Sequence, residues 1–445
     1  MKFLTRFIIN IIIILGLTAC ATTEETTATV ANIETSSPFV QVEGLNFIKD
    51  GKPYHFLGTN LWYGANLAAE GQRERLLQEL DELKLMGIEN LRVVGASEGA
   101  GDSRIRKSFQ PQLGVYDEEM LVGLDFLLSE MGKRDMTAVI FLNNYWVWTG
   151  GMSQYMAWVN GTEVPNPFLP QYEWNDFMRY SATFYSSNEA ISAHQNYMDQ
   201  LLNRTNTITG KPYIDDPAIM SWQLANEPRP GNDASDSTVI AAYIKWVDQT
   251  ARYIKAHDPN HLVSTGNEGL AGSVWLESAY RDAHKLDHID YMTFHLWIKN
   301  WGWYDANNPE ETYPEANRKA LDYIDQHLVF AAKLGKPITL EEFGIPRDEH
   351  SYSIASSTEW RDKYYADVFE ALYQNALAGG AAAGSNFWGW GGKGIPDTDD
   401  EHWAPGDDFV GDPPQEPQGL NSVFSTDSTT VNIIRNYTRM MNAIQ

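Results

Sequence analysis

Hydrophobic and polar positions along the chain predict strands that alternate with helices. Apolar runs such as 90–94 and 138–142 have the length and composition of buried strands. Between such runs leucines recur at helical spacing, and Leu76, Leu80 and Leu83 mark one face of an expected helix. Alternating strands and helices are typical of α/β proteins, in which helices cover a parallel sheet.

Eight strand-like segments can be read in this way. Their number, and the lack of a glycine-rich phosphate loop, favour a closed (β/α)8 TIM barrel over an open doubly wound sheet. Asp50-Gly51, between 39–49 and 54–57, predicts a hairpin that closes one end of the barrel. The expected strands are 54–60, 90–94, 138–142, 219–225, 262–265, 291–295, 338–343 and 384–388.

The N-terminal residues have the layout of a secretory signal. Lys2 and Arg6 precede an apolar run over 7–17, which is too short to cross a membrane as a mature helix. We therefore expect a signal peptide over 1–20.

The expected signal ends in Leu-Thr-Ala-Cys, which resembles a bacterial lipobox. Since Cys20 is the only cysteine, we expect it to be diacylated and to anchor the exported protein to the cell envelope. Ala21 in place of Asp favours the outer membrane in a diderm bacterium. The alternative is an ordinary signal that happens to precede a cysteine.

Residues 21–38 have no apolar period, so we expect a flexible tether there.

Composition narrows the choice of partners. The chain has 33 basic and 59 acidic side chains and a net charge of −26, so nucleic acid and anionic lipid head groups are poor partners. Fifteen tryptophans and 22 tyrosines exceed what a core of this size needs, and sugar rings stack on such side chains. We expect residues 39–445 to form one catalytic domain, monomeric and without disulfides, that acts on a neutral polymer.

Two glutamates stand at the C-terminal ends of predicted strands, where barrels of this type carry their catalytic groups. Glu227 ends the fourth strand in Asn-Glu-Pro, and Glu342 ends the seventh in Glu-Phe-Gly. Retaining cleavage of a glycosidic bond needs a carboxylic acid and a carboxylate about 5–5.5 Å apart. Their environments should move the two pKa values in opposite directions. Taken alone, Glu227 could instead be an ordinary carboxylate at a helix start.

The paired motifs, in this order on an eight-stranded pattern, resemble clan A glycoside hydrolases, specifically family 5. The resemblance covers essentially the whole chain after the tether. It implies that Glu227 is the acid/base, Glu342 the nucleophile, and Asn226 a hydrogen-bond partner of the sugar 2-hydroxyl. By strand alternation, Glu341 should point away from the site. Hydrolysis by two carboxylates requires no cofactor or metal, and the chain lacks His-Glu-x-x-His.

Two further strand ends fit the resemblance. Arg92 is a charge in an apolar strand, which is costly to bury without a partner, and the resemblance makes Glu342 that partner. His295 matches the strand-six histidine of the family, although a histidine after an apolar strand can also be a core residue. Trp297 stands where the commonest family pattern has tyrosine, so that contact to the nucleophile is left unassigned.

Other segments resemble the mannan-active branch of the family, which contains β-mannanases and β-mannosidases. The third strand ends in Asn143-Asn-Tyr-Trp146 instead of the frequent histidine, and 142–152 and 264–269 are similar as well. Trp388 matches the tryptophan that forms the floor of the −1 sugar site. The candidates for other substrate contacts, each of which could instead be packing, are Trp62, Asn143, Trp146, Trp297 and Trp301.

The resemblance implies retaining hydrolysis of β-1,4-mannosidic bonds in mannan and manno-oligosaccharides. Mannose differs from glucose only by its axial 2-hydroxyl, so a β-1,4-glucanase is the alternative within the class. A non-catalytic carbohydrate-binding lipoprotein is the alternative outside it. Such a protein would keep the tryptophans but lose one glutamate, whereas both are present.

The segment 391–425 is far longer than a connection between strand eight and the last helix requires, and such loops are usually functional. It follows Trp388, so it should lie at the mouth of the cleft. A wall there would close the glycone end and favour release of mannose from chain ends. If the segment folds away instead, the enzyme is an endo-β-1,4-mannanase.

The same segment contains the acidic stretch 397–401, which lacks EF-hand spacing. This favours a solvated loop over a calcium site.

Overall fold

The computed structural model describes residues 37–101, 103–397 and 402–444. The expected signal, the lipidation site Cys20 and most of the tether lie outside these residues, as do positions 398–401 of the acidic stretch. Residues 37–445 form one compact unit. No helix within the described part of the chain is long and apolar enough to cross a membrane.

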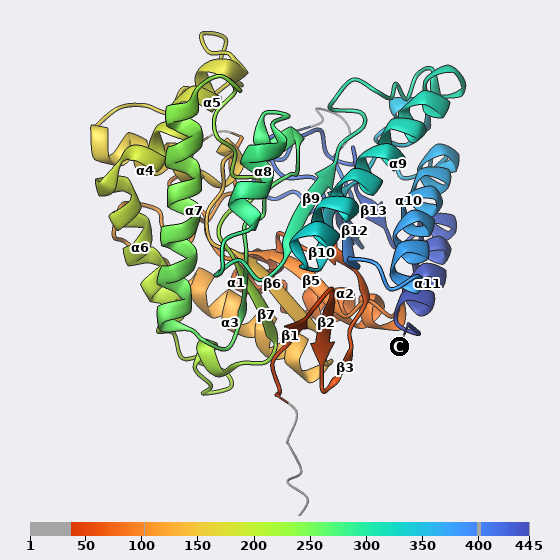
Figure 1. Cartoon of the computed structure of the whole chain (residues 1–445), viewed down its shortest axis with the longest axis horizontal. Coiled ribbons are helices and arrows are strands. Elements are labelled where there is room, and N and C mark those ends of the chain that lie inside the picture. The colour runs from red at the N-terminus through yellow and green to blue at the C-terminus, as the bar shows by residue number, and fades with distance from the viewer. Residues whose placement is uncertain (1–36, 102, 398–401, 445) are drawn as a thin grey trace, which may run out of the picture. The chain divides into compact units, whose positions relative to one another are not determined.

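The first strands of the described chain form a small antiparallel sheet at one end of the unit (Figure 1). It consists of β1 (Gln41–Glu43), β2 (Asn46–Lys49) and β3 (Lys52–Pro53). Asp50 and Gly51 have φ values of 54° and 74°, as a tight hairpin requires, so the predicted hairpin is confirmed. Phe47 packs on Phe56 and Tyr291 with ring centroids 6.1 and 5.2 Å apart, which closes this end of the barrel.

Eight parallel strands form the central sheet, and the predicted (β/α)8 barrel is confirmed. Their order is β8-β7-β6-β5-β4-β11-β10-β9, and a backbone bond of 3.1 Å from His295 to Glu268 helps to join the two outer strands. The bounds differ from the prediction by at most two residues at either end. The strands are β4 (Phe56–Asn60), β5 (Asn90–Val94), β6 (Thr137–Phe141), β7 (Ile219–Gln223), β8 (Leu262–Ser264), β9 (Met292–Leu296), β10 (Ile338–Phe343) and β11 (Ala382–Phe387).

Helices surround the barrel, and their apolar faces form one large core with the strands. In α3, Leu124, Leu127, Leu128 and Met131 are buried, and Asp117 caps the first turn by accepting two backbone N–H groups. The helices are α1 (Gly64–Ala69), α2 (Arg73–Leu85), α3 (Glu118–Lys133), α4 (Gly151–Asn160), α5 (Trp174–Ala182), α6 (Asn188–Leu202), α7 (Ser237–His257), α8 (Glu277–His284), α9 (Pro309–Leu334), α10 (Glu359–Leu377) and α11 (Ser428–Met441).

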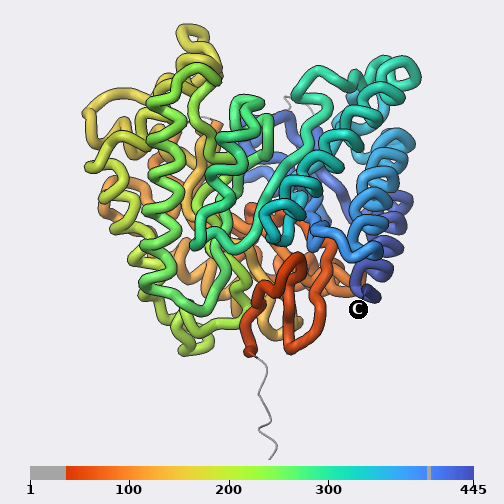
Figure 2. Tube along the Cα trace, viewed as in Figure 1, coloured from red at the N-terminus to blue at the C-terminus, as the bar shows by residue number. Residues whose placement is uncertain are grey.

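Two segments that are not part of the repeating strand–helix pattern lie at the open end of the barrel, one around α5 and one after β11. Figure 2 shows the chain around α5 at the end opposite to the N-terminal sheet. The long connection after β11 begins with β12 (Trp390–Gly392) and ends with β13 (Val423–Phe424), and these two strands pair in parallel. Between them, Phe409 stacks on Tyr63 at 5.9 Å. The described part of the connection therefore lies against the barrel, next to Trp388.

Candidate active site

Glu227 lies beyond the end of β7 on an unusual backbone. Its φ of 49° is in the left-handed region, which is uncommon for a residue with a side chain and recurs at functional sites. The Glu227 amide donates to the carbonyl of Gly266 over 2.9 Å. A Cβ on Gly266 would lie 1.9 Å from the carbonyl oxygen of Ala225. Glycine at position 266 is therefore required for the backbone that presents Glu227 to the pocket.

Glu341 and Glu342 both face the interior of the barrel mouth, contrary to the expected alternation. The β9–β10 register shifts between Leu340 and Glu342, so Glu342 pairs with His295 and Glu341 is the extra residue of a bulge. Glu341 is buried, and its Oε2 accepts a hydrogen bond from Gln223 over 2.7 Å. The bulge thus places two carboxylates on the same side of β10.

Arg92, on β5, is fully buried and connects two of the functional strand ends. Its guanidinium donates to Asn226 over 2.7 Å and forms a second, shorter bond and ion pair with Glu342. Bonds to Gln223 at 2.8 Å and Asn60 at 3.1 Å fix its plane. The buried charge is therefore paired, and Arg92 holds Asn226 and Glu342 in fixed positions.

His295, on β9, lies between the two glutamates. Its Nδ1 is 2.6 Å from Glu227 Oε1 and 3.3 Å from Glu342 Oε2. This nitrogen and one oxygen of each carboxylate all lie within 4.8 Å of one another. The spacing is close to the separation of about 5–5.5 Å that direct attack by one carboxylate requires.

The Glu227–His295 pair holds a proton in the free site. Burial disfavours the charged histidine, but the charge of Glu342 and the hydrogen bond to Glu227 raise the pKa of His295 well above its usual value. Burial alone would raise the pKa of Glu227, but His295, with Arg229, lowers it to about 2. The upward shift expected for the acid is therefore absent from the free site, because an imidazolium lies against the carboxylate.

Glu227, His295 and Glu342 also form a group, within the described residues, that could hold a metal ion. A histidine ligand must be neutral, whereas the pKa of His295 is raised. Glu342 is already paired with Arg92. The donor set therefore fits carboxylate chemistry with a shared proton better than it fits metal coordination.

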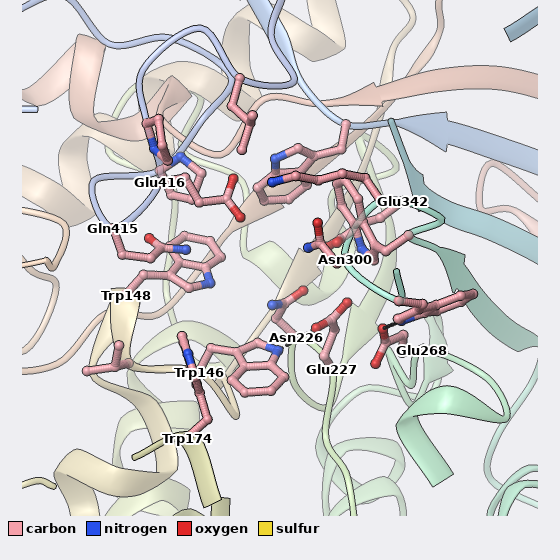
Figure 3. Close-up of a pocket in the computed structure, with 18 of the residues that line it drawn as sticks. Trp146, Trp148, Trp174, Asn226, Glu227, Glu268, Asn300, Glu342, Gln415 and Glu416 are labelled. Carbon is pink, nitrogen blue, oxygen red and sulfur yellow. Dashed lines mark hydrogen bonds between the residues drawn. The ribbon is translucent and has the colours of Figure 1, made fainter. Parts of the chain in front are cut away.

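A pocket of about 640 Å³ opens over these groups and is lined by aromatic, polar and charged side chains (Figure 3). Asn226, Glu227 and Glu342 line it, whereas Arg92 and His295 contact them from the barrel interior. The tryptophans that were expected to meet substrate and that do line the pocket are Trp146, Trp297, Trp301 and Trp388.

Trp62 and Asn143 were also expected to contact substrate, but they are not among the described residues that line the pocket. Trp62 is buried under the β12–β13 connection, where its indole donates to the carbonyl of Gly411 over 3.0 Å. Asn143 is buried as well, and its carbonyl accepts the amide of Asn226 over 2.8 Å. Both expectations were wrong, because these residues support the site from within the core.

The pocket contains residues that the sequence did not single out. Gln415 and Glu416 come from the β12–β13 connection, Phe168 comes from the segment between α4 and α5, and Trp174 is the first residue of α5. The length of segment 391–425 and its place after Trp388 indicated that a wall could reach the cleft, but not which side chains it would present. Phe168 and Trp174 lie where hydrophobic periodicity offers no guide, because no barrel element contains them.

Arg229 and Glu268 form an ion pair beside Glu227 and also line the pocket. Burial raises the pKa of Glu268 to about 7, although Arg229 opposes that shift. Trp301 donates to Glu268 over 3.3 Å, and the Arg229 guanidinium lies 4.8 Å from the ring of Trp146. Glu268 is thus a third carboxylate of the pocket, held by its own cation.

Comparison with known families gives a match over the whole folded unit. The model of the glycoside hydrolase family 5 β-mannosidase-like proteins matches residues 37–445. Among curated proteins, mannan endo-1,4-β-mannosidase 3 of Arabidopsis thaliana is 30% identical over 427 residues, covering 92% of this chain and 91% of that protein. Mannan endo-1,4-β-mannosidase 1 of Oryza sativa subsp. japonica is 29% identical and covers 79% of this chain and 78% of its own length.

Solved structures show the same likeness. A family 5 mannosidase from Rhizomucor miehei superposes with a TM-score of 0.82 at 37% identity, covering 91% of this chain and 97% of that one. A glutamate variant of the same enzyme was solved in complex with mannosyl-fructose, also with a TM-score of 0.82, at 36% identity and the same coverage. The endo-β-1,4-mannanase from Thermotoga petrophila has a TM-score of 0.66 at 25% identity, covering 88% of this chain and 78% of that one.

Proposed function

The chain belongs to the β-mannosidase-like glycoside hydrolases of family 5 and hydrolyses β-mannosidic bonds, and we propose that it does so by a retaining double displacement. Glu342 is the nucleophile and Glu227 the acid/base in this proposal. The observation that supports it most directly is that carboxylate oxygens of the two residues lie within 4.8 Å of each other. That distance leaves no room for the water that an inverting enzyme places between its carboxylates.

In the first step Glu342 attacks the anomeric carbon and the glycosidic bond breaks. The leaving oxygen takes a proton from Glu227, which receives it from His295 along their 2.6 Å hydrogen bond, so the step ends with Glu227 as a carboxylate and His295 neutral. In the second step Glu227 removes a proton from water, and the water oxygen displaces Glu342 to release mannose with its original configuration. Asn226, held by Arg92, is placed to bind the sugar 2-hydroxyl.

Azide rescue tests both roles. Glu342→Ala and Glu227→Ala should each lower turnover of mannotriose by a factor of about 10⁴ or more. With azide and an activated aryl β-mannoside, the first variant should form α-mannosyl azide and the second β-mannosyl azide. NMR of wild-type hydrolysis should show β-mannose first. If α-mannose appears first, the proposed mechanism is wrong.

The finer specificity depends on the β12–β13 connection, and we propose that it closes the glycone end of the pocket. Gln415 and Glu416 project into the pocket on one side, near Trp148 (Figure 3). Glu416 Oε2 and Gln415 Oε1 are buried without a hydrogen-bond partner among the described residues. Burial, with nearby Asp412, raises the pKa of Glu416 to about 8, so at neutral pH its carboxyl group can both donate and accept. Hydroxyl groups of a terminal mannose would satisfy these atoms.

The wall is held rigidly from beneath. Asp412 is buried, and its carboxylate accepts backbone N–H groups of Gly419 at 3.0 Å and Asn421 at 2.7 Å. Pro413 and Pro417 flank the two wall residues and restrict the backbone further. A fixed wall supports release of mannose from the non-reducing ends of manno-oligosaccharides.

The second candidate is internal cleavage of mannan, and the names of the curated relatives favour it. Products from mannohexaose and cellohexaose separate the possibilities. An exo-acting enzyme releases mannose from the start, whereas an endo-acting one gives mixed short oligomers and a rapid fall in mannan viscosity. Glu416→Ala should lower mannose release, while Glu349→Ala, an acidic residue outside the pocket, should not. Hydrolysis of cellohexaose but not mannohexaose would instead support the β-1,4-glucanase alternative.

We propose, from the sequence, that the protein is exported and anchored through a lipid on Cys20, and that it acts as a monomer. The single cysteine at the end of the signal-like segment supports the anchor. Cys20→Ser should move the enzyme from the detergent phase to the aqueous phase of a detergent partition. Unchanged partition would exclude the anchor, and a light-scattering mass above that of one chain would exclude the monomer.

A further inference from the structure

We propose that Phe168 and Trp174 form a platform that binds a sugar ring on the leaving-group side of the cleaved bond. The ring that it binds is the second sugar of the leaving group, counted from that bond. The ligand is a β-1,4-linked hexopyranose chain, which would stack its C–H faces on the aromatic rings. This inference rests on the proposed function, because it assigns the leaving-group side from the role of Glu227.

The two residues are unusual in being large, aromatic and exposed while lining the pocket. Trp174 is 45% exposed and Phe168 is 43% exposed, and both contribute to the pocket wall. Their rings meet edge to face with centroids 5.5 Å apart. Exposed aromatic surface is costly unless a ligand covers it, and aromatic side chains beside a few polar groups are typical of ligand pockets.

A series of contacts connects the platform to the acid/base. The indole of Trp146 donates a hydrogen bond to Glu227, and the Trp174 ring lies 5.6 Å from the Trp146 ring. The ring of Trp146 is already engaged, because Phe177 stacks on it at 6.2 Å and Arg229 lies 4.8 Å away. Trp174 is therefore the next aromatic surface outward from Glu227 that a sugar can cover.

The platform lies on the side where the leaving group must be. Glu227 protonates the glycosidic oxygen, so the departing chain begins at Glu227 and extends away from the nucleophile. Figure 3 shows Trp174 beyond Trp146, at the other side of the pocket from Glu416. The two ends of the pocket are thus different, with a polar wall at one and aromatic rings at the other.

The segment that carries the platform is locally fixed. Glu173 and Asp176 form a capping box at the start of α5, which sets the direction of Trp174 as the first helical residue. The amide of Phe168 donates to the side chain of Asn166 over 3.1 Å. Little conformational entropy is then lost when a sugar binds these rings, which favours a binding role.

The structure also contains a matched control. Trp275 is 55% exposed and contacts the pocket tryptophan Trp301 at 5.7 Å, but it is not among the described residues that line the pocket. Trp275 is therefore a control: it is an exposed tryptophan next to the pocket, and the proposal assigns it no contact with the sugar. An effect of Trp275, and not of Trp174, would place the outer sugar site on the opposite rim.

The test compares kcat/KM for mannotriose with kcat/KM for mannobiose in wild type, Trp174→Ala, Trp174→Phe, Phe168→Ala and Trp275→Ala. Mannotriose can reach the platform, whereas mannobiose ends one ring short. The mannotriose to mannobiose ratio should fall about tenfold in Trp174→Ala and less in Phe168→Ala. It should be largely retained in Trp174→Phe, which keeps an aromatic face, and unchanged in Trp275→Ala.

An unchanged ratio in Trp174→Ala and Phe168→Ala, with wild-type activity on both sugars, would overturn the platform and leave the proposed function intact. Failure of wild type to cleave either sugar would count against the proposed function itself. If Trp174→Ala does not fold, as judged by circular dichroism, Phe168→Ala and Trp174→Phe still decide the question, because a platform requires the first to lower the ratio.

Discussion

His295 determines where the catalytic proton is held, because its Nδ1 lies 2.6 Å from Glu227 and 3.3 Å from Glu342. The pKa of His295 is raised and that of Glu227 is lowered, so the pair keeps one proton until the pH exceeds the raised value. Without the imidazole, the proton would be held by a buried carboxyl group alone, whose pKa is lower than that of the pair.

We therefore expect His295→Gln to shift the alkaline limb of the kcat/KM profile to lower pH and to reduce its maximum by about 10²-fold. His284→Gln is the control, because the pKa of His284 is lowered by burial to about 3 and its ring bonds to Thr265, away from the carboxylates. The measurement is the pH profile on an aryl β-mannoside. An alkaline limb that does not move would show that His295 does not hold the proton.

The β12–β13 connection owes its shape to one buried carboxylate. Asp412 accepts the amides of Gly419, Asn421 and Ser422, and an asparagine there could accept with only one oxygen. Asp412→Asn should loosen the wall, so that the share of mannose among mannohexaose products falls while the hydrolysis rate of an aryl mannoside changes less. Product analysis by chromatography tests this, and an unchanged product pattern would mean that the wall does not depend on Asp412.

Helix α3 is tied to the segment after α6 through Asp125. Burial would raise the pKa of this carboxyl group, but hydrogen bonds from Arg204, Tyr213 and Thr207 lower it below its usual value. A lowered folded pKa contributes stability above the unfolded value of about 3.9, and this contribution is lost as the pH falls through the folded value.

Asp125→Asn should therefore lower the free energy of unfolding by about 2 kcal/mol at pH 7, because the half-buried Arg204 then keeps only its ion pair with the exposed Glu118. Below the folded pKa, where the wild-type carboxyl group is also neutral, the difference should largely disappear. Urea unfolding at the two pH values measures this. Asp248→Asn, whose exposed ion pair with Arg252 contributes little, is the control. An equal difference at both pH values would argue against the electrostatic explanation.

At the scale of the whole molecule, the sequence predicted the repeating strands of the barrel but missed contacts made by segments outside that repeat. Apolar runs located all eight barrel strands to within two residues, because a parallel barrel buries every strand. The strand ends then located Glu227 and Glu342 at the pocket. Trp62 could not be distinguished from a substrate contact, because the connection that covers it comes from more than 300 residues later in the chain.

The wrong direction of Glu341 and the missed pocket residues also result from contacts between segments that are far apart in the sequence. The bulge at Glu341 is a property of two paired strands, so strand alternation within β10 alone gave the wrong direction. Phe168 and the wall residues lie in irregular segments, Trp174 begins a helix outside the barrel repeat, and only the folded chain brings Trp174 and Glu416 to one pocket.

The proposed wall at Glu416 would also set the order in which molecules leave the pocket. If one end of the pocket is closed, the mannose held there can depart only after the rest of the chain has moved out through the open side. The enzyme then cannot slide along a polymer and must release it after every cut. Free mannose should act as a competitive inhibitor of oligosaccharide hydrolysis, since it occupies the innermost position that each new chain end must reach. Initial rates at several mannose concentrations would show this as a rising KM with constant kcat, whereas a falling kcat would mean that mannose leaves by another route.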